Sequence, residues 1–540
     1  MNDCPGCGAS LRYDISAGQL VCDHCSSQYD PYEYDAGHNQ ETGDGAFKAE
    51  LLTCPNCGAQ IMAADHSAAE YCSYCGSFVM LTASETSGVR PDLIVPFQKT
   101  KEDCKKIYRQ KLAKHIFAPG ELKDPDYLNR FSGFYIPYWV YDVGFARNPR
   151  ITGTTSKQEG DYLVTSVFDI TGDLDAEFNG ITYDASSAFD DNISESIAPY
   201  RMEEMKEFTP SYLFGFYANT EDVEEKAYEK SAKELATEAV YERILEENDL
   251  KDYKVENKRG TTAVGARIKK AQRAMLPVWF LTWRKKDRVA YSVVNGETGK
   301  IYAEIPIDIR KYLLLSLILT IPLYFLAERM FQFTAQTGML LGSILTLAAA
   351  MIFHAQMTSI GARNTGFGDY RSKDAPAEPK PIVPMFGDDN IRSQNAVVFG
   401  RRWIIGFAVI FALAFMAAGW ILEHISTSDM TVFYLCCLAV LAALGAFLAY
   451  CSVQVIIDGK VESGPADKVI RMVPWLGPVC CLLAAVMALI HPVEDYWYYG
   501  VCILSLVVTA IMLVTAISLH NRSVTRPVPD FFAKAKEERR

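Results

Sequence analysis

Cys4-Pro5-Gly6-Cys7 opens the chain and is followed, after fourteen intervening residues, by Cys22-Asp23-His24-Cys25. The same spacing returns 50 residues later in Cys54-Pro55-Asn56-Cys57 and Cys72-Ser73-Tyr74-Cys75. Two C-x2-C knuckles about 15–20 residues apart are typical of a four-thiolate zinc site, because each tight turn brings two sulfurs to one ion. The sequence therefore predicts two structural Zn²⁺ ions. Their ligands are Cys4, Cys7, Cys22 and Cys25 for one ion, and Cys54, Cys57, Cys72 and Cys75 for the other.

A site closed by four thiolates has no open position for water or substrate, so neither ion is expected to be catalytic. The alternative is a pair of disulfide-stapled modules. It is disfavoured because no secretory signal precedes Cys4 and intracellular thiols stay reduced. His24 and His66 are spare ligands nearby, and we expect both to be ordinary surface histidines.

The repeat predicts a multidomain chain with two β zinc ribbons at its start. We expect the first ribbon over residues 1–36, a linker over 37–53 and the second ribbon over 54–82. Each ribbon is too small to bury a useful apolar core, so the metal must supply its folding energy. A second linker, Thr82 to Pro91, should lead into a cytoplasmic α+β domain over residues 91–310.

Residue patterns outline this α+β domain. Runs rich in aromatic and β-branched residues predict strands at Leu93–Phe97, Gly133–Tyr141, Tyr162–Ile170, Ala274–Trp283, Arg288–Val294 and Ile301–Ile305. Helical spacing predicts helices at Lys101–His115 and at Glu221–Asn248, the second one long and exposed. The aromatic blocks, including Phe208–Tyr217, are expected to be core rather than ligand pockets.

Charge is distributed unevenly along the 540 residues, whose formal net charge is −12. Residues 311–540 contain 18 Lys and Arg against 16 Asp and Glu, a net of +2, which leaves −14 for the first 310 residues. In the sequence around the knuckles, the basic residues Arg12 and Lys48 are outnumbered by acidic residues. An acidic half of this kind attracts polyanions poorly, so nucleic acid is a disfavoured partner.

The composition becomes strongly apolar after residue 310. About 20 apolar residues cross a bilayer, and six segments approach this length. They are Tyr312–Ala327, Gly338–Gln356, Trp403–Leu422, Val432–Tyr450, Pro474–Ile490 and Trp497–Leu519. We therefore expect a bundle of about six transmembrane helices. Two lie in residues 311–357 and four in 403–520, with a cytoplasmic loop over 358–402 and a basic cytoplasmic tail over 521–540.

The loops between these segments alternate in basic charge. Those at 328–337, 423–431 and 491–496 contain Arg329 as their single Lys or Arg, whereas 357–402 contains seven and 451–473 contains three. Because cytoplasmic loops are enriched in Lys and Arg, both termini are predicted to be cytoplasmic. The predicted location is the plasma membrane, as a multi-pass protein, and that placement also keeps the ribbon thiols reduced.

Six motifs occur in order over about residues 50–325. They are Cys72-Ser73-Tyr74-Cys75-Gly76, Pro91-Asp92-Leu93-Ile94-Val95-Pro96-Phe97, Gly133-Phe134-Tyr135-Ile136-Pro137-Tyr138-Trp139, Phe208-Thr209-Pro210-Ser211-Tyr212-Leu213, Leu276-Pro277-Val278-Trp279-Phe280 and Asn295-Gly296-Glu297-Thr298-Gly299-Lys300. On these motifs the chain resembles bacterial membrane proteins with an N-terminal TFIIB-type zinc ribbon. The resemblance implies a link with phage-shock and SPFH (flotillin-like) membrane-stress modules. Five predicted spans after Ala327 exceed the one or two expected of that family.

These features favour a membrane-anchored adaptor that presents a cytoplasmic interaction domain to a soluble or peripheral protein. The alternatives are a transporter or membrane-embedded enzyme and, third, a nucleic-acid-binding protein. No nucleophile–base pair or phosphate loop is legible, so no catalytic or cofactor-binding residue is assigned, and Asp190-Asp191 is expected to be an exposed turn rather than a cation site. Tyr74, Ile61 and Met62 are candidate partner contacts at the ribbon tips; alternatively they cover the ribbon's own thin core.

Overall fold

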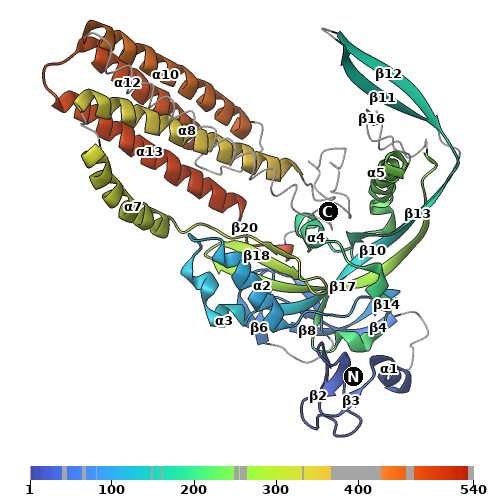
Figure 1. The fold of residues 1–540 in the computed structure, drawn as a ribbon. Helices are drawn as coiled ribbons and strands as arrows, with labels where there is room; N and C mark the ends of the chain where they lie inside the picture. The colour runs from blue at the N-terminus through green and yellow to red at the C-terminus, as the bar shows by residue number, and fades with distance from the viewer. Residues whose placement is uncertain are drawn as a thin grey trace.

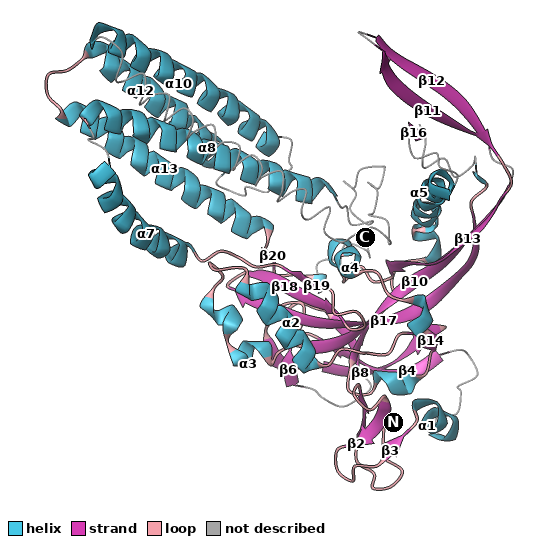
Figure 2. Cartoon of the chain, in the orientation of Figure 1, coloured by secondary structure: helices cyan, strands magenta, loops and turns pink. Residues whose placement is uncertain are grey.

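The computed structural model describes residues 2–38, 46–63, 69–80, 82–147, 150–159, 162–247, 254–255, 264–330, 334–366, 427–457 and 467–532. It contains a large β-rich region from which a bundle of long helices extends to one side, while a slender two-stranded arm extends to the other (Figure 1). Helices and strands are distinguished by colour in Figure 2. The two tetracysteine clusters, the sheets and the apolar helices confirm the coarse architecture predicted from the sequence.

The strands of the N-terminal half are β1 Leu11–Asp14, β2 Gln19–Cys22, β3 Gln28–Tyr29, β4 Ala46–Thr53, β5 Gln60–Ala63, β6 Ala69–Tyr71, β7 Phe78–Met80, β8 Thr82–Val89, β9 Leu93–Ile94 and β10 Ser132–Arg147. The remaining strands are β11 Arg150–Glu159, β12 Tyr162–Thr171, β13 Leu174–Asp184, β14 Lys206–Glu207, β15 Tyr217–Asn219, β16 Lys254–Val255, β17 Arg267–Lys285, β18 Arg288–Asn295, β19 Ile301–Ala303 and β20 Arg526–Pro527. The predicted strands at 93–97, 133–141, 162–170, 274–283, 288–294 and 301–305 are confirmed, with shifts at their ends.

The α-helices are α1 Pro31–His38, α2 Lys101–Ala113, α3 Pro125–Leu128, α4 Asp191–Ile197, α5 Glu229–Glu247, α7 Ile309–Met330, α8 Ala335–Gly366, α10 Thr427–Ile457, α11 Asp467–Met472, α12 Leu476–Ile490 and α13 Tyr496–Ser523. Short 3-10 turns lie at Gly120–Lys123, Met202–Glu204, Pro210–Leu213, Glu225–Ala227 and Val473–Trp475. The predicted helix at 101–115 is confirmed as α2, which begins at a capping box between Thr100 and Asp103.

Strands β10 and β17 form the centre of a twelve-stranded sheet. They pair antiparallel from Ser132 opposite Phe280 to Gly144 opposite Arg267. Successive residues of β10 are buried on opposite faces: Phe134 and Ile136 pack in one apolar cluster, and Tyr135 packs in another. A strand apolar on both faces is expected when both faces are covered. The aromatic blocks are therefore core, as predicted.

Helix α5 covers one face of the strands near β10 and β13. Ala232, Ala236 and Val240 recur at helical spacing and are buried in a cluster with Trp139 and Tyr183. The prediction of an exposed helix over 221–248 is wrong for this face. Glutamates and lysines lie between the buried residues of this face, which are Ala232, Ala236, Thr237, Val240, Tyr241 and Leu245. Small residues such as alanine do not distinguish a buried face from a solvated one in the sequence.

Both predicted linkers contain strands. Strand β4 pairs antiparallel with β8 from Ala46 opposite Val89 to Thr53 opposite Thr82, so residues 46–53 and 82–89 belong to the large sheet. Residues 39–45 of the first linker lie outside the described residues. The sequence of β8 is Thr-Ala-Ser-Glu-Thr-Ser-Gly-Val, which carries small and polar side chains and almost no apolar alternation. Its pairing comes from the backbone, and residue patterns do not detect that.

Within the described residues, four helical segments are long and apolar enough to cross a membrane: Ala335–Thr358, Cys437–Gln454, Ile470–Ile490 and Tyr496–Ser523. They overlap four of the six predicted spans. The predicted span at 312–327 lies in α7, a helix of 22 residues that is not among these four. The predicted span at 403–422 lies outside the described residues, as does most of the predicted loop at 358–402. Of the six predicted spans, the described residues therefore support four.

Candidate metal centres

The sulfurs of Cys4, Cys7, Cys22 and Cys25 lie within 4.8 Å of one another at the tip of the first ribbon. The Sγ–Sγ distance is 3.5 Å both from Cys4 to Cys25 and from Cys7 to Cys22. Each knuckle closes through a backbone hydrogen bond: Gly8 donates to the Cys4 carbonyl and Ser26 to the Cys22 carbonyl. Both donor residues have positive φ, a backbone conformation that is energetically less favourable for Ser26 than for a glycine.

The second predicted set, Cys54, Cys57, Cys72 and Cys75, also gathers within 4.8 Å. Its Sγ–Sγ distances are 3.9 Å from Cys54 to Cys75 and 3.7 Å from Cys57 to Cys72. A tetrahedral ion with sulfur ligands at about 2.3 Å places the sulfurs about 3.8 Å apart. Both cysteine sets therefore have the spacing of a closed four-thiolate metal centre, as the sequence predicted.

Within each set the thiols differ in acidity. Hydrogen bonds with the Ser27 side chain and backbone lower the pKa of Cys25 to about 6. In the second centre, hydrogen bonds with Cys57 and then Cys72 lower the pKa of Cys54 to about 6, while the same contact with Cys54 is the main cause that raises the pKa of Cys57. Four adjoining thiols cannot all ionise in the absence of a bound cation, because each thiolate disfavours the ionisation of its neighbours. A divalent ion removes this obstacle.

The two centres differ in burial. Cys7 and Cys25 of the first centre are exposed, whereas all four cysteines of the second are buried. The second centre is covered because its Cys72–Cys75 knuckle lies on strands β17 and β18. Thr282 donates a hydrogen bond to the Ser73 carbonyl, Tyr291 donates to the Tyr74 carbonyl at 2.7 Å, and Arg284 donates to the Cys75 carbonyl at 3.2 Å.

Tyr74 is 4% exposed, so the prediction that it lies at an accessible ribbon tip is wrong. Its ring packs at 6.1 Å from the Phe280 ring and 5.4 Å from the Phe531 ring. Ile61 and Met62 are buried as well, because β5 pairs with β15 inside the large sheet. The alternative expectation, that these residues cover the ribbon's own core, is also incomplete. They join the ribbon to the rest of the sheet domain, which means the β-rich region formed by residues 2–308.

The first ribbon is joined to the same region by its other end. The Tyr13 amide donates to the Phe214 carbonyl at 3.0 Å, and the Tyr13 and Tyr212 rings meet edge to face at 5.0 Å. Asp35 accepts hydrogen bonds from Thr209 and from the Ser211 amide. The knuckles with Cys7 and Cys25 remain at the outer end. This ribbon is thus fixed at its base and accessible at its tip.

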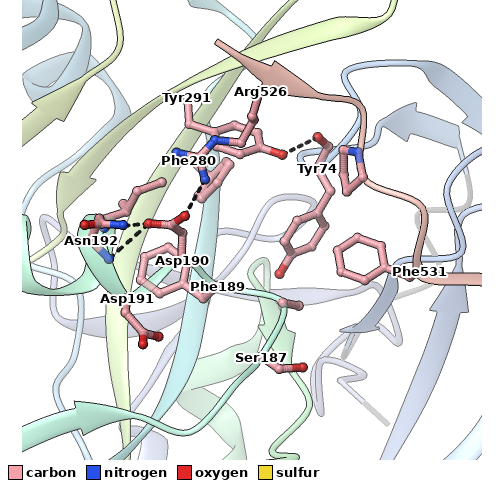
Figure 3. Close-up of a pocket in the computed structure, with 13 residues that line it drawn as sticks. Tyr74, Ser187, Phe189, Asp190, Asp191, Asn192, Phe280, Tyr291, Arg526 and Phe531 are labelled. Atoms are coloured by element: carbon pink, nitrogen blue, oxygen red, sulfur yellow. Dashed lines mark hydrogen bonds and ion pairs between the residues drawn. The ribbon is translucent and has the colours of Figure 1, made fainter. Parts of the chain in front are cut away.

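Sequence reasoning missed the segment that closes the second centre. Residues 524–532, the C-terminal strap, follow α13 and return across the sheet domain (Figure 3). The Phe531 amide donates to the Cys57 carbonyl at 2.8 Å, and Phe532 lies so close to Gly58 that an added Cβ there would meet it at 2.9 Å. The apolar run at Val528, Phe531 and Phe532, unusual in a basic tail, was the available signal.

The strap also supplies a cation to the Asp190-Asp191 segment. Arg526 donates to Asp190 at 2.6 Å and to Glu304, so it lies between two carboxylates (Figure 3). Burial lowers and these carboxylates raise the pKa of Arg526, and the net result lies above its ordinary value. Burial also raises the pKa of Glu304, against the effect of Arg526. Asp190 is half-buried and caps α4, so it is neither the exposed turn expected nor open to an external cation.

A cavity of about 180 Å³ lies between this ion pair and the second metal centre. Aromatic rings dominate its wall, from the ribbon, the sheet and the strap: Tyr74, Phe189, Phe280, Tyr291 and Phe531. Its polar atoms are largely committed, since Asp190 bonds Arg526 and the α4 amides, and Tyr291 bonds the ribbon. In this arrangement the strap covers the second centre, and the polar groups around the cavity are used in contacts within the protein.

Among known proteins, the chain is similar to "Uncharacterized protein YdjG" of Bacillus subtilis (strain 168). The two are 27% identical over 316 residues, which is 56% of this chain and 89% of that protein. No model of a known protein family matches the chain. No solved structure matches it.

We expect the purified full-length chain to bind two metal ions, with zinc as the element, because each cysteine set closes one tetrahedral centre. Elemental analysis of protein prepared without chelator should give two ions per chain. Cys75→Ser should reduce this to one, and Cys104→Ser, which alters a buried cysteine outside both sets, should leave it at two. One ion or none in the wild-type protein contradicts the assignment.

Removing the Tyr74 ring should destabilise the sheet domain by about 3 kcal/mol, because truncating a buried aromatic side chain leaves a cavity. The measurement is chemical unfolding of Tyr74→Ala in detergent. Ile116→Ala is the control, since Ile116 is 69% exposed in the same domain and its truncation should change stability by less than about 0.5 kcal/mol. Equal effects of the two substitutions would show that Tyr74 does not join the ribbon to the sheet.

Proposed function

We propose that this chain is a membrane-anchored adaptor: a multi-pass protein that holds a rigid cytoplasmic sheet domain, built around two structural Zn²⁺ ions, at the bilayer. The observation that carries the proposal is the attachment of the sheet domain to the helices at both ends of the helical region. The chain leaves the domain at α7 and returns at α13, and the two points are bonded to each other. A domain held in this way moves with the bundle and presents its surface at a fixed place.

Asn521 forms the first part of this attachment. Its side-chain oxygen accepts a hydrogen bond from the Ile307 amide at 2.7 Å, and its side-chain nitrogen donates to the Ile307 carbonyl at 2.8 Å. Arg288 forms the second part by donating to the Arg522 carbonyl and the Thr525 hydroxyl, both at 2.8 Å. Strand β20 then pairs with β18. Four hydrogen bonds and one strand pairing thus join the start and the end of the helical region to each other and to β18.

This attachment supports an even number of membrane crossings, because the chain leaves and returns on the same side. The four apolar helices satisfy this rule alone. Over residues 313–322 helix α7 has many exposed side chains, among them Leu314, Leu317 and Ile321, each more than half exposed, which suits lipid contact. Counting α7 gives five, so a sixth crossing is then required, and the apolar segment at 403–422 can provide it. The Lys and Arg distribution favours cytoplasmic termini.

The adaptor role rests on the chemistry of the accessible surface. Closed thiolate centres offer no position for a substrate, and the cavity near Asp190 contains the chain's own Arg526. The first ribbon exposes a compact tip around Pro5, Gly6 and His24, fixed by a metal and by its docked base. Small rigid surfaces of this kind cost little entropy on binding. The acidic charge of the first 310 residues, −14, disfavours nucleic acid as the partner.

Transport is the second candidate, because polar side chains meet inside the bundle. Thr346 donates to the Ser505 carbonyl at 3.2 Å, His354 bonds Ser452 at 3.1 Å, and Gln356 bonds His520 at 2.9 Å. Polar residues buried among membrane helices can mark a pathway. Polar residues of this kind also join helices that pack closely. A Cβ added at Gly342 would lie only 3.3 Å from the Cβ of Ser505. The hydrogen bonds between these helices and their close packing favour the role of joining helices.

The topology predicts which sites are reachable from outside the cell. A cysteine introduced at Val493, which is 97% exposed in the turn between α12 and α13, should react with an impermeant maleimide in whole cells. A cysteine at Asp287, in the turn between β17 and β18, should react only after lysis. The reverse pattern would refute the orientation.

The adaptor role predicts that a protein co-purifies with the wild-type chain through the first ribbon. Replacing Pro5 and His24 with Glu should weaken that co-purification at least tenfold while two zinc ions remain bound. Ser16→Glu, in an exposed turn of the same ribbon, is the control and should retain the partner. If no partner is found for the wild type and vesicles containing the full chain move a solute, transport replaces the adaptor proposal.

A further inference from the structure

Strands β11 and β12 form an arm that leaves the large sheet on the side away from the helical bundle (Figure 1). They pair antiparallel over their whole length, from Arg150 opposite Thr171 to Glu159 opposite Tyr162. With β16 they make a separate three-stranded sheet in the order β12-β11-β16. Strand β12 is therefore at the edge of this sheet within the described part of the chain.

Apolar side chains are concentrated on β12 and point to both faces of the arm. Tyr162 and Val164 are 79% and 44% exposed on one face, and Leu163 and Val167 are 70% and 64% exposed on the other. The strand beside it is polar, with Thr154, Thr155, Ser156, Lys157 and Gln158 opposite the same stretch. Exposed hairpins usually separate apolar and polar residues by face, whereas β12 has exposed apolar side chains on both faces.

Edge strands are usually protected against pairing by charged residues, proline, bulges or short length. Strand β12 is ten residues long, contains Asp169 as its single charged residue and has no proline. Its register with β11 runs without a shift, so it has no bulge either. Within the described residues β12 is therefore a long, apolar edge strand with none of the usual protection.

We propose that β12 pairs antiparallel with β12 of a second copy of this chain, about a twofold axis at Ser166. In that register Tyr162 lies opposite Ile170 and Val164 opposite Phe168, while Ser166 meets its own copy. Aromatic and β-branched residues placed opposite each other stabilise such pairs, by about 0.2–1 kcal/mol each. The two arms then form one six-stranded sheet with the two apolar strands at its centre.

Self-complementarity identifies the partner as a second copy. Asp169 lies opposite Leu163 in this register, so the two copies of the carboxylate do not face each other. A closed twofold contact of this type uses the same surface on both subunits. The arm is a slender projection of the β-rich region that is separate from the helical bundle (Figure 1). The proposal does not depend on the adaptor role, and dimerisation is measured separately from partner binding.

Disulfide cross-linking of the full-length protein tests the register. Ser166→Cys places a cysteine on the proposed axis, and a mild oxidant should convert most of the protein to a covalent dimer. Thr155→Cys is the matched control, because Thr155 lies directly opposite Ser166 on β11, on the same face and one strand further from the axis. It should cross-link no more than the wild type. Equal cross-linking of the two variants, or none from Ser166→Cys, contradicts the register.

Light scattering in detergent tests the dimer itself. The wild-type protein should have twice the mass of the chain, and the double variant Val164→Lys and Val167→Lys should have half of the wild-type mass while retaining two zinc ions. These lysines place charge on both faces of the edge without altering the large sheet. A monomeric wild type, a variant that remains dimeric, or Ser166→Cys cross-linked to a different protein each overturns the proposal.

Discussion

The second cysteine centre is the constraint on which the rest of the sheet domain depends. Its four sulfurs are buried, and four adjacent buried thiols cannot ionise together without a cation. Metal binding to such a set releases about 10–16 kcal/mol in small zinc domains, more than the whole stability of many domains. An ion bound by these four cysteines would hold two knuckles in place, and the knuckles carry the carbonyl groups to which the sheet and the strap bond. If the ion were removed, the knuckles would no longer be held in the positions at which the sheet and the strap form hydrogen bonds with them.

The consequence is a continuous set of contacts from metal to membrane helix. The Cys57 carbonyl accepts from the strap at Phe531, Arg526 of the strap lies between Asp190 and Glu304, and Asn521 joins the end of α13 to Ile307. Each contact satisfies a buried or half-buried polar group, so breaking one leaves a donor or acceptor unpaired at a cost of about 1–3 kcal/mol. The sheet domain, the second ribbon and the end of the bundle are therefore one mechanical unit.

Those parts of the fold and of the cysteine clusters that depend on residues close together in the sequence could be predicted from it. Cysteine spacing predicted that eight cysteines gather in two clusters of four, because a knuckle is a short-range turn. Aromatic runs predicted β10, β17 and β18, because burial on both faces leaves a pattern. Features made by distant residues were missed. Strand β8 pairs through its backbone with small polar side chains, Tyr74 is buried by Phe280 and Phe531, and the strap bonds residues more than 200 positions away. A single sequence contains no signal for which surface a short apolar tail will cover.

Amide hydrogen exchange, with the two metal centres emptied one at a time, tests the central claim most directly. Cys57→Ser empties the second centre and Cys25→Ser the first, and exchange is then followed in residues 524–532 and at the end of α13. We expect the strap to lose protection against exchange when the second centre is emptied and to keep it when the first is emptied. A strap that stays protected in Cys57→Ser, or that opens equally in both variants, would show that the second centre does not hold the sheet domain to the helices.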